Sequence, residues 1–118
     1  MGATGRQLSG QAGEDRALDY LAAQGLTLVE RNFRCKVGEI DLVMNDRGSL
    51  VFVEVRRRDG RDFGGAIASV TPAKQRRMVR AAQFYLLRYR QLPPCRFDVV
   101  AIDGTGLQWL RNAIVQGM

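Results

Sequence analysis

The chain has 118 residues, of which 46% are hydrophobic, so it has the size and apolar content of one small folded domain. Its 18 basic and 12 acidic residues leave a net charge of +6, which favours a polyanionic partner. It contains no histidine, which excludes Ser-His-Asp and Cys-His catalysis and imidazole-ligated zinc. Acid–base chemistry must therefore come from carboxylates, lysine, tyrosine or water activated by a metal ion.

The N-terminal part predicts a leader followed by a helix. Residues 1–12 are rich in Gly, Ser and Ala without a hydrophobic signal core, so we expect a flexible leader before a single domain over residues 13–118. No apolar run approaches the roughly 20 residues of a membrane helix, and we expect a cytoplasmic protein. A helix is predicted over residues 10–24 with Gly25 as its stop. Its apolar stripe is Ala17, Leu18, Leu21 and Ala22.

Three strands are predicted next, over residues 26–34, 40–45 and 50–57. The second and third are joined by Asp46–Ser49, a good turn sequence. The third begins with a run that is apolar on both faces, which indicates a central strand. Residues 58–70 contain three glycines and are expected to form a mobile connection.

A second helix is predicted from Thr71 to about Arg90, because Thr is a favoured N-cap and Pro72 suits the first helical position. Strands over residues 97–102 and 107–110 complete the order αβββαββ, a compact α/β domain. The buried stripe of this helix is expected to be Met78, Val79, Ala82, Tyr85, Leu86 and Tyr89. The two cysteines, Cys35 and Cys95, form no CxxC pair and are either free thiols or one disulfide.

The predicted turn also sets the register of the central hairpin. If Asp46–Ser49 closes a four-residue turn, Asp41 lies opposite Glu54. Directly paired side chains have Cβ atoms about 4.5–5.5 Å apart, and like charges there are unfavourable. Two carboxylates so placed require a cation, a shared proton or solvent, and a divalent ion both satisfies them and supports chemistry.

Two more polar residues head the apolar stripes of the helices. Glu14 precedes the first stripe and Gln75 the second, so both are expected to point at the sheet. Taken alone, Glu14 is equally explained by complementing the helix N-terminus, and Gln75 by bonding to the backbone. One arrangement of helices over a sheet would bring both to Asp41 and Glu54.

The acidic pair has ordinary explanations as well. Asp41 and Glu54 could be strand ends exposed to water, and Glu39 opposite Arg56 could form a weak surface ion pair. The convergence of four polar groups on one place favours a functional site over these alternatives.

Asp41 followed after twelve residues by Glu-Val-Arg resembles the PD-(D/E)XK nuclease signature, with Arg56 where lysine is usual. A wider set of motifs, over about residues 12–112, resembles the bacterial YraN family, an endonuclease-like group that is itself similar to archaeal Holliday junction resolvases. These motifs are Asn32-Phe33-Arg34, Gly38-Glu39-Ile40-Asp41-Leu42, Phe52-Val53-Glu54-Val55, Lys74-Gln75 and Arg96-Phe97-Asp98.

The resemblance implies a three-layer, restriction-endonuclease-like core with a mixed sheet flanked by helices. It implies that Asp41 and Glu54 are ligands of Mg²⁺ or Mn²⁺, that Glu14 is an auxiliary acidic residue, and that Gln75 lies beside the scissile phosphate. Arginine is effectively always protonated and cannot act as a base. Arg56 would therefore stabilise charge, and the attacking hydroxide would come from water activated by the ion.

Three functions remain open at this stage. The first is a Mg²⁺-dependent endonuclease or DNA phosphodiesterase acting on branched or damaged DNA. The second is a catalytically weakened nucleic-acid-binding module that retains the nuclease fold, and the third is an interaction domain for an acidic protein. A homodimer would suit a junction-cleaving enzyme, although no residue demonstrates one. The residues expected to contact the phosphate backbone are Arg57, Arg58, Arg61, Lys74 and Arg76.

Overall fold

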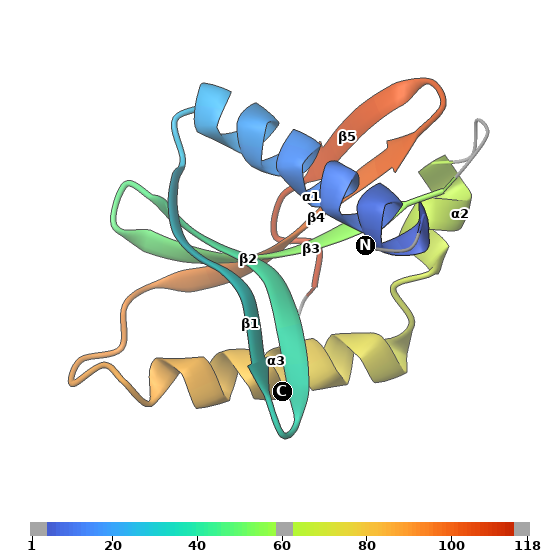
Figure 1. Cartoon of the computed structure of the whole chain (residues 1–118). Coiled ribbons are helices and arrows are strands. Elements are labelled where there is room, and N and C mark those ends of the chain that lie inside the picture. The colour runs from blue at the N-terminus through green and yellow to red at the C-terminus, as the bar shows by residue number, and fades with distance from the viewer. Residues whose placement is uncertain (1–4, 59–62, 115–118) are drawn as a thin grey trace.

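A computed structural model describes residues 5–58 and 63–114, which form a five-stranded sheet with helices on both faces (Figure 1). In chain order the elements are α1 (Gly5–Ala23), β1 (Thr27–Cys35), β2 (Gly38–Asp46), β3 (Ser49–Arg57), α2 (Phe63–Ala68), α3 (Pro72–Leu86), β4 (Cys95–Asp103) and β5 (Gly106–Leu110).

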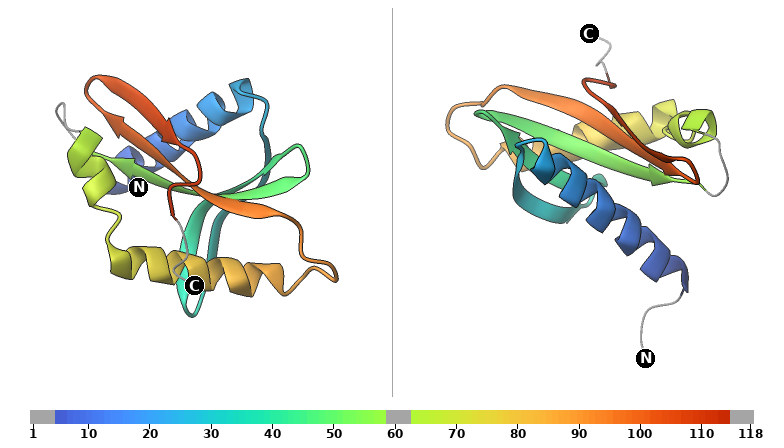
Figure 2. Two further views of the ribbon diagram at one scale, coloured as in Figure 1. Left: turned by 180° about the vertical axis from the view of Figure 1, so that it is seen from behind. Right: turned by 90° about the horizontal axis from the view of Figure 1, so that it is seen from above.

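The strands lie in the order β1-β2-β3-β4-β5, and only the β3–β4 pair is parallel. One apolar cluster packs the sheet against α3, and a second packs the opposite face against α1, so the molecule has three layers (Figure 2). This mixed sheet, in the predicted order of elements, confirms the expected fold class and is consistent with a restriction-endonuclease-like fold.

The central hairpin has the predicted register from the turn as far as the Leu42–Val53 pair. Asp46 pairs with Ser49, and the two residues between them have positive φ angles, 55° at Arg47 and 93° at Gly48. Positive φ at both central positions is typical of the two-residue turns that match the twist of a hairpin. The local turn chemistry therefore fixes which residues of β2 and β3 face each other.

The predicted start and inner face of the first helix need correction. The helix begins at Gly5, so residues 5–12 are helical and do not form the flexible leader that we expected. Gly13, Ala17 and Leu21 are buried, whereas Ala22 is exposed. The prediction wrongly placed Ala22 on the buried face, because alanine is compatible with either face of a helix. Gly25, at φ 100°, ends the helix as predicted.

The segment between β3 and the long helix also differs from expectation. Part of the connection predicted over residues 58–70 is the short helix α2, and residues 59–62 lie outside the described part of the chain. Helix α3 begins as predicted, with the Thr71 hydroxyl accepting a hydrogen bond from the backbone N–H of Lys74 at 3.2 Å. It ends at Leu86, earlier than Arg90, because its last turn tightens into bonds between residues three apart.

Cys35 and Cys95 are both free thiols, so the disulfide alternative does not apply. Within residues 5–58 and 63–114, no helix has the length and apolar content required to cross a membrane.

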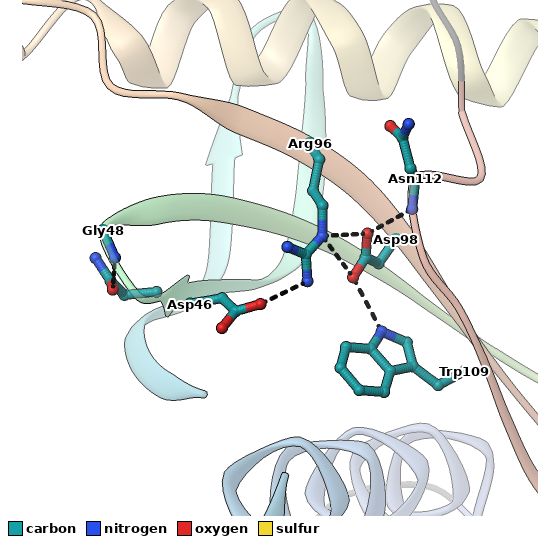
Figure 3. Close-up of polar contacts among 7 residues, drawn as sticks. Asp46, Gly48, Arg96, Asp98, Trp109 and Asn112 are labelled. Carbon is teal, nitrogen blue, oxygen red and sulfur yellow. Dashed lines mark hydrogen bonds and ion pairs between the residues drawn. The ribbon is translucent and has the colours of Figure 1, made fainter. Parts of the chain in front are cut away.

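A fully buried carboxylate, Asp98, joins β4 to β5 and to the segment that follows β5 (Figure 3). Its two oxygens accept hydrogen bonds from Arg96 Nε at 3.1 Å and 3.3 Å, from Trp109 Nε1 at 2.9 Å and from the backbone N–H of Asn112 at 2.8 Å. Arg96 in turn pairs with Asp46 at 3.0 Å. Because each oxygen accepts a hydrogen bond, the cost of burying this charge is offset, and removal of either partner would be destabilising.

Replacing Asp98 by alanine should lower the free energy of unfolding by about 3–5 kcal/mol, because the Arg96 charge would lose its buried partner. Urea denaturation followed by fluorescence of the single tryptophan measures the change. Asp19→Ala, at an exposed helix position, is the matched control and should stay within about 0.5 kcal/mol of the parent. A loss at Asp98 no larger than at Asp19 would contradict the assignment.

Candidate active site

The site lies where β2 separates from β3 (Figure 1). Pairing between these strands ends at Leu42 and Val53, whereas β2 remains paired with β1 as far as Gly38. Beyond the separation, the Asp41 side chain takes over from the backbone, because its Oδ2 accepts a hydrogen bond from the Val55 N–H at 2.8 Å. The end of β3 is thus left open on one side, with an acidic side chain at the point of divergence.

A kink in both strands of the β1–β2 hairpin produces this divergence. Side chains two apart in a strand normally share a face, yet Leu42 packs in the α1 cluster while Ile40 packs in the α3 cluster. The change occurs across Asp41. On β1 the facing residue, Asn32, has a left-handed φ of 54°. Asparagine tolerates this conformation better than most residues, so Asn32 allows the hairpin to turn toward α3.

Asp41 and Glu54 lie close enough to interact strongly. Burial raises the pKa of Asp41 to about 8, and the negative charge of Glu54 adds to the rise, followed by smaller contributions from Glu14 and Glu39. Burial also raises the pKa of Glu54. At neutral pH the pair therefore retains a proton, which is one of the ways in which two such carboxyl groups are stabilised.

Two cations, Arg56 and Lys74, offset the burial of Glu54. Arg56 NH1 lies 3.1 Å from Glu54 Oε2, and both Arg56 and Lys74 lower the pKa of this carboxyl group. Arg56 Nε donates to the Ser69 hydroxyl at 2.9 Å, and that hydroxyl donates to the carbonyl of Ala66 in α2 at 2.6 Å. The unpredicted helix α2 therefore positions the arginine that holds Glu54.

The divergence opens a cleft of about 540 Å³, which we call the hairpin cleft. Its walls are the tip of the β1–β2 hairpin and the first half of α3, and Glu54 and Arg56 line it from the end of β3. Five of its lining side chains are basic and two are acidic, so the walls carry a net charge of +3. The charged residues are Arg34, Lys36, Glu39, Glu54, Arg56, Lys74 and Arg77.

The two helix residues predicted for the site differ in their placement. Glu14 is partly buried on α1 and its charge acts on Asp41, while its Oε1 lies 3.5 Å from Arg31 of β1. The Gln75 amide nitrogen donates to the carbonyl of Val70 at 3.0 Å, which is the backbone interaction that ordinarily accounts for such an amide. Glu14 thus belongs to the electrostatic surroundings of the pair, and Gln75 is anchored at the start of α3.

The predicted phosphate contacts are divided between two places. Lys74 lines the hairpin cleft, whereas Arg57 and Arg58 line a smaller cavity of about 230 Å³ together with Arg16. Arg76 is exposed on α3 and its neighbour Arg77 lines the cleft instead. Arg61 lies outside the described residues.

Sequence reasoning missed Arg34, Lys36, Arg77 and Ser69. The spacing of Lys74 and Arg77, three residues apart on one side of a helix, is a signal that could have identified Arg77. The hairpin residues carried no local signal, because they reach α3 only through the kink at Asn32. Ser69 carried none either, since it lies in the segment that we expected to be irregular.

The fold and the site together define a small three-layer α/β protein with a half-buried acidic pair, of which Glu54 lines a basic cleft. The chain belongs to the uncharacterised protein family UPF0102, whose sequence pattern matches residues 13–102. It is 63% identical over 111 residues to the UPF0102 protein of Herminiimonas arsenicoxydans, covering 94% of this chain and 90% of that one. The UPF0102 protein of Ralstonia nicotianae is 59% identical over 114 residues, covering 92% and 88%. The YraN-like family membership implied by the motifs is thereby confirmed.

The left-handed conformation of Asn32 predicts a clear ranking of substitutions. Asn32→Val should lower the free energy of unfolding by about 2 kcal/mol, whereas Asn32→Gly should be close to neutral, because only glycine adopts this φ freely. Chemical denaturation measures both variants. Thr27→Val, an exposed substitution on the same strand, serves as the control. Equal stability of the Asn32→Val and Asn32→Gly variants would show that the hairpin does not depend on this kink.

The raised pKa of Asp41 predicts a pH-dependent stability. Between pH 3.8 and about 8 the folded state keeps a proton on Asp41 that the unfolded state releases, so stability falls as pH rises through this window. Asp41→Asn mimics the protonated form and should gain melting temperature relative to the parent as pH rises from about 5 to about 8. Thermal unfolding with a chelator present measures this difference, and Asp19→Asn is the exposed control. A difference that is the same at both pH values would contradict the assigned shift.

Proposed function

We propose that this protein is a Mg²⁺-dependent DNA phosphodiesterase of the PD-(D/E)XK nuclease superfamily, with its active site at Asp41 and Glu54. The observation that carries the proposal is the half-buried pair of interacting carboxyl groups next to a basic cleft. Interacting carboxyl groups whose pKa values are raised beside a cleft are typical of functional sites. The basic walls are suited to a substrate that carries phosphate.

The donor set of the pair fits a small divalent cation. One oxygen of each carboxyl group is engaged, since Asp41 Oδ2 accepts from Val55 and Glu54 Oε2 faces Arg56. Across residues 5–58 and 63–114, no group of three or more Asp, Glu, Cys or His side chains gathers into a metal cluster. Mg²⁺ commonly uses one or two carboxylates and completes its shell with water and substrate phosphate, so two ligands suffice.

When bound, Mg²⁺ supplies Lewis-acid polarisation of a phosphate oxygen. The side chains around it set the geometry and the charge. Arg56 cannot act as a base and is held by Glu54 and Ser69, so its contribution is to orient Glu54 and add positive charge. Lys74 makes no ion pair within the described residues, and we assign it to the phosphate, where charge develops in the transition state.

Asp41→Asn should lower DNA cleavage in Mg²⁺ or Mn²⁺ by about 100-fold or more, since loss of a metal ligand removes several kcal/mol of charge stabilisation. Lys74→Ala should lower it by about tenfold to 100-fold. Gel assays on branched, nicked and single-stranded DNA measure the rates.

Arg80→Ala is the control, because Arg80 is exposed on α3 and is not a lining residue of the cleft. Circular dichroism establishes that each variant is folded. Absence of cleavage on every substrate, or cleavage unaffected by Asp41→Asn, would refute the proposed activity.

A second candidate is a nucleic-acid-binding module that keeps the fold but turns over weakly or not at all. Arg56 favours it, because the residue that would be lysine in the nuclease signature is instead ion-paired with Glu54. This candidate predicts DNA binding that weakens steeply with salt, without any cleavage that depends on Asp41.

A further inference from the structure

Three cations of the hairpin cleft have no ion-pair partner in the part of the chain that the structure describes. Arg34 pairs with Glu39 and Arg56 pairs with Glu54, but Lys36, Lys74 and Arg77 take part in no ion pair within residues 5–58 and 63–114. Lys74 also lowers the pKa of Glu54 through its charge, without a direct ion pair. Lys36 comes from the tip of the hairpin and the other two from α3, so the unpaired charges stand on two different walls of one cleft. A ligand with several negative charges along its length would satisfy them together.

The width of the cleft is fixed by a close contact between its walls. A Cβ atom added at Gly38 would lie 2.7 Å from the backbone carbonyl oxygen of Arg77, so the hairpin rests directly on the backbone of α3. The Cys35 thiol donates to the carbonyl of Gly38 at 3.4 Å and ties the two sides of the hairpin tip together. The cleft is thus a preformed space, and only glycine at position 38 permits this approach.

The size of the cleft distinguishes between forms of nucleic acid. A cavity of about 540 Å³ is in the range of sites for small ligands. A duplex is a broad, stiff cylinder that carries two backbones and cannot enter such a space. An unpaired strand is flexible and exposes one backbone, which can lie between the walls and contact cations on both.

The lining also indicates how a strand would be recognised. None of the described lining residues is aromatic, and the apolar ones include Val37 and Met78. Stacking of bases on aromatic rings is therefore not supported, and the contacts available are with phosphate. Recognition would depend on strand form and not on base sequence.

We propose that the hairpin cleft binds an unpaired DNA strand through its phosphates, with Lys36 on one side and Lys74 and Arg77 on the other. The inference rests on the proposed function, because the strand so held leads to Glu54 at the end of β3. The substrate class is then DNA with a single-stranded segment, and fully paired DNA is a poor ligand.

Fluorescence anisotropy in a chelating buffer tests binding separately from turnover. The probes are an oligothymidylate of about 12 nucleotides, a blunt duplex of equal length and the same duplex with a single-stranded flap. We expect the single strand and the flap to bind at least about tenfold more tightly than the blunt duplex. Polyglutamate of equal charge serves as a competitor, and equal competition by it would overturn the assignment to DNA.

Two substitutions on opposite walls should act alike. Lys36→Glu and Arg77→Glu should each weaken single-strand binding by about tenfold or more and reduce its salt dependence. Arg80→Glu makes the same change of charge on α3 away from the cleft and should leave the preference for single strands intact. Gly38→Ala should weaken binding without any change of charge, because it forces the walls apart.

The outcomes separate this inference from the proposed function. Equal affinity for duplex and single strand, with Lys36→Glu no weaker than Arg80→Glu, would overturn the inference even if Asp41-dependent cleavage were observed. Selective binding of single strands without such cleavage would support the inference and refute the proposed activity.

Discussion

The end of the β2–β3 ladder after Leu42 and Val53 is the constraint on which the site depends. A buried backbone N–H without a partner costs about 1–3 kcal/mol, and Asp41 removes that cost at Val55 by accepting its hydrogen bond. The Asp41 side chain thereby supplies the hydrogen-bond acceptor that the backbone of β2 would otherwise provide. Because β3 also pairs with β4 along its length, it continues straight while β2 turns away with β1. The cleft is the space left between them.

Asp41 accepts the hydrogen bond of Val55 in place of a strand partner, and this position conflicts with the charge of its carboxyl group. Its carboxyl group must be close to the backbone of β3, which places it beside Glu54 and away from water. Arg56 and Lys74 compensate the charge of Glu54, whereas the effects on Asp41 that come from charged neighbours all raise its pKa. The pair therefore retains a proton in the isolated protein. Because the charged neighbours of Asp41 do not stabilise its ionised form, a cation that binds there can displace the proton.

Local chemistry made part of this architecture predictable. The turn at Asp46–Ser49 set the hairpin register as far as Leu42 and Val53, and Thr71-Pro72 gave the start of α3. The strands separate before Asp41 and Glu54, so the predicted direct pairing of these two residues is not part of the ladder. The rest depends on non-local geometry. The left-handed Asn32 cannot be read from a pattern of alternation, because it reverses the faces of both strands of its hairpin. For this reason the sequence did not predict the walls of the cleft. Arg57 and Arg58, close to Glu54 in sequence, were predicted as phosphate contacts, whereas Arg34, Lys36 and Arg77 line the cleft.

Comparison of Asp98 with the Asp41–Glu54 pair shows which carboxyl groups of this small domain are available for chemistry. Asp98 is the more deeply buried, but its oxygens accept bonds from Arg96, Trp109 and Asn112, so its charge is fully compensated by the protein (Figure 3). The role of Asp98 in the Arg96-Phe97-Asp98 motif is therefore explained by its contribution to stability. Asp41 and Glu54 are each engaged through one oxygen and destabilise each other. Folding alone does not require such a pair, because Asn at position 41 could accept the same bond from Val55 without the repulsion. The raised pKa of Asp41 shows that the ionised pair is unfavourable without a cation, and the proposed Mg²⁺ would relieve it.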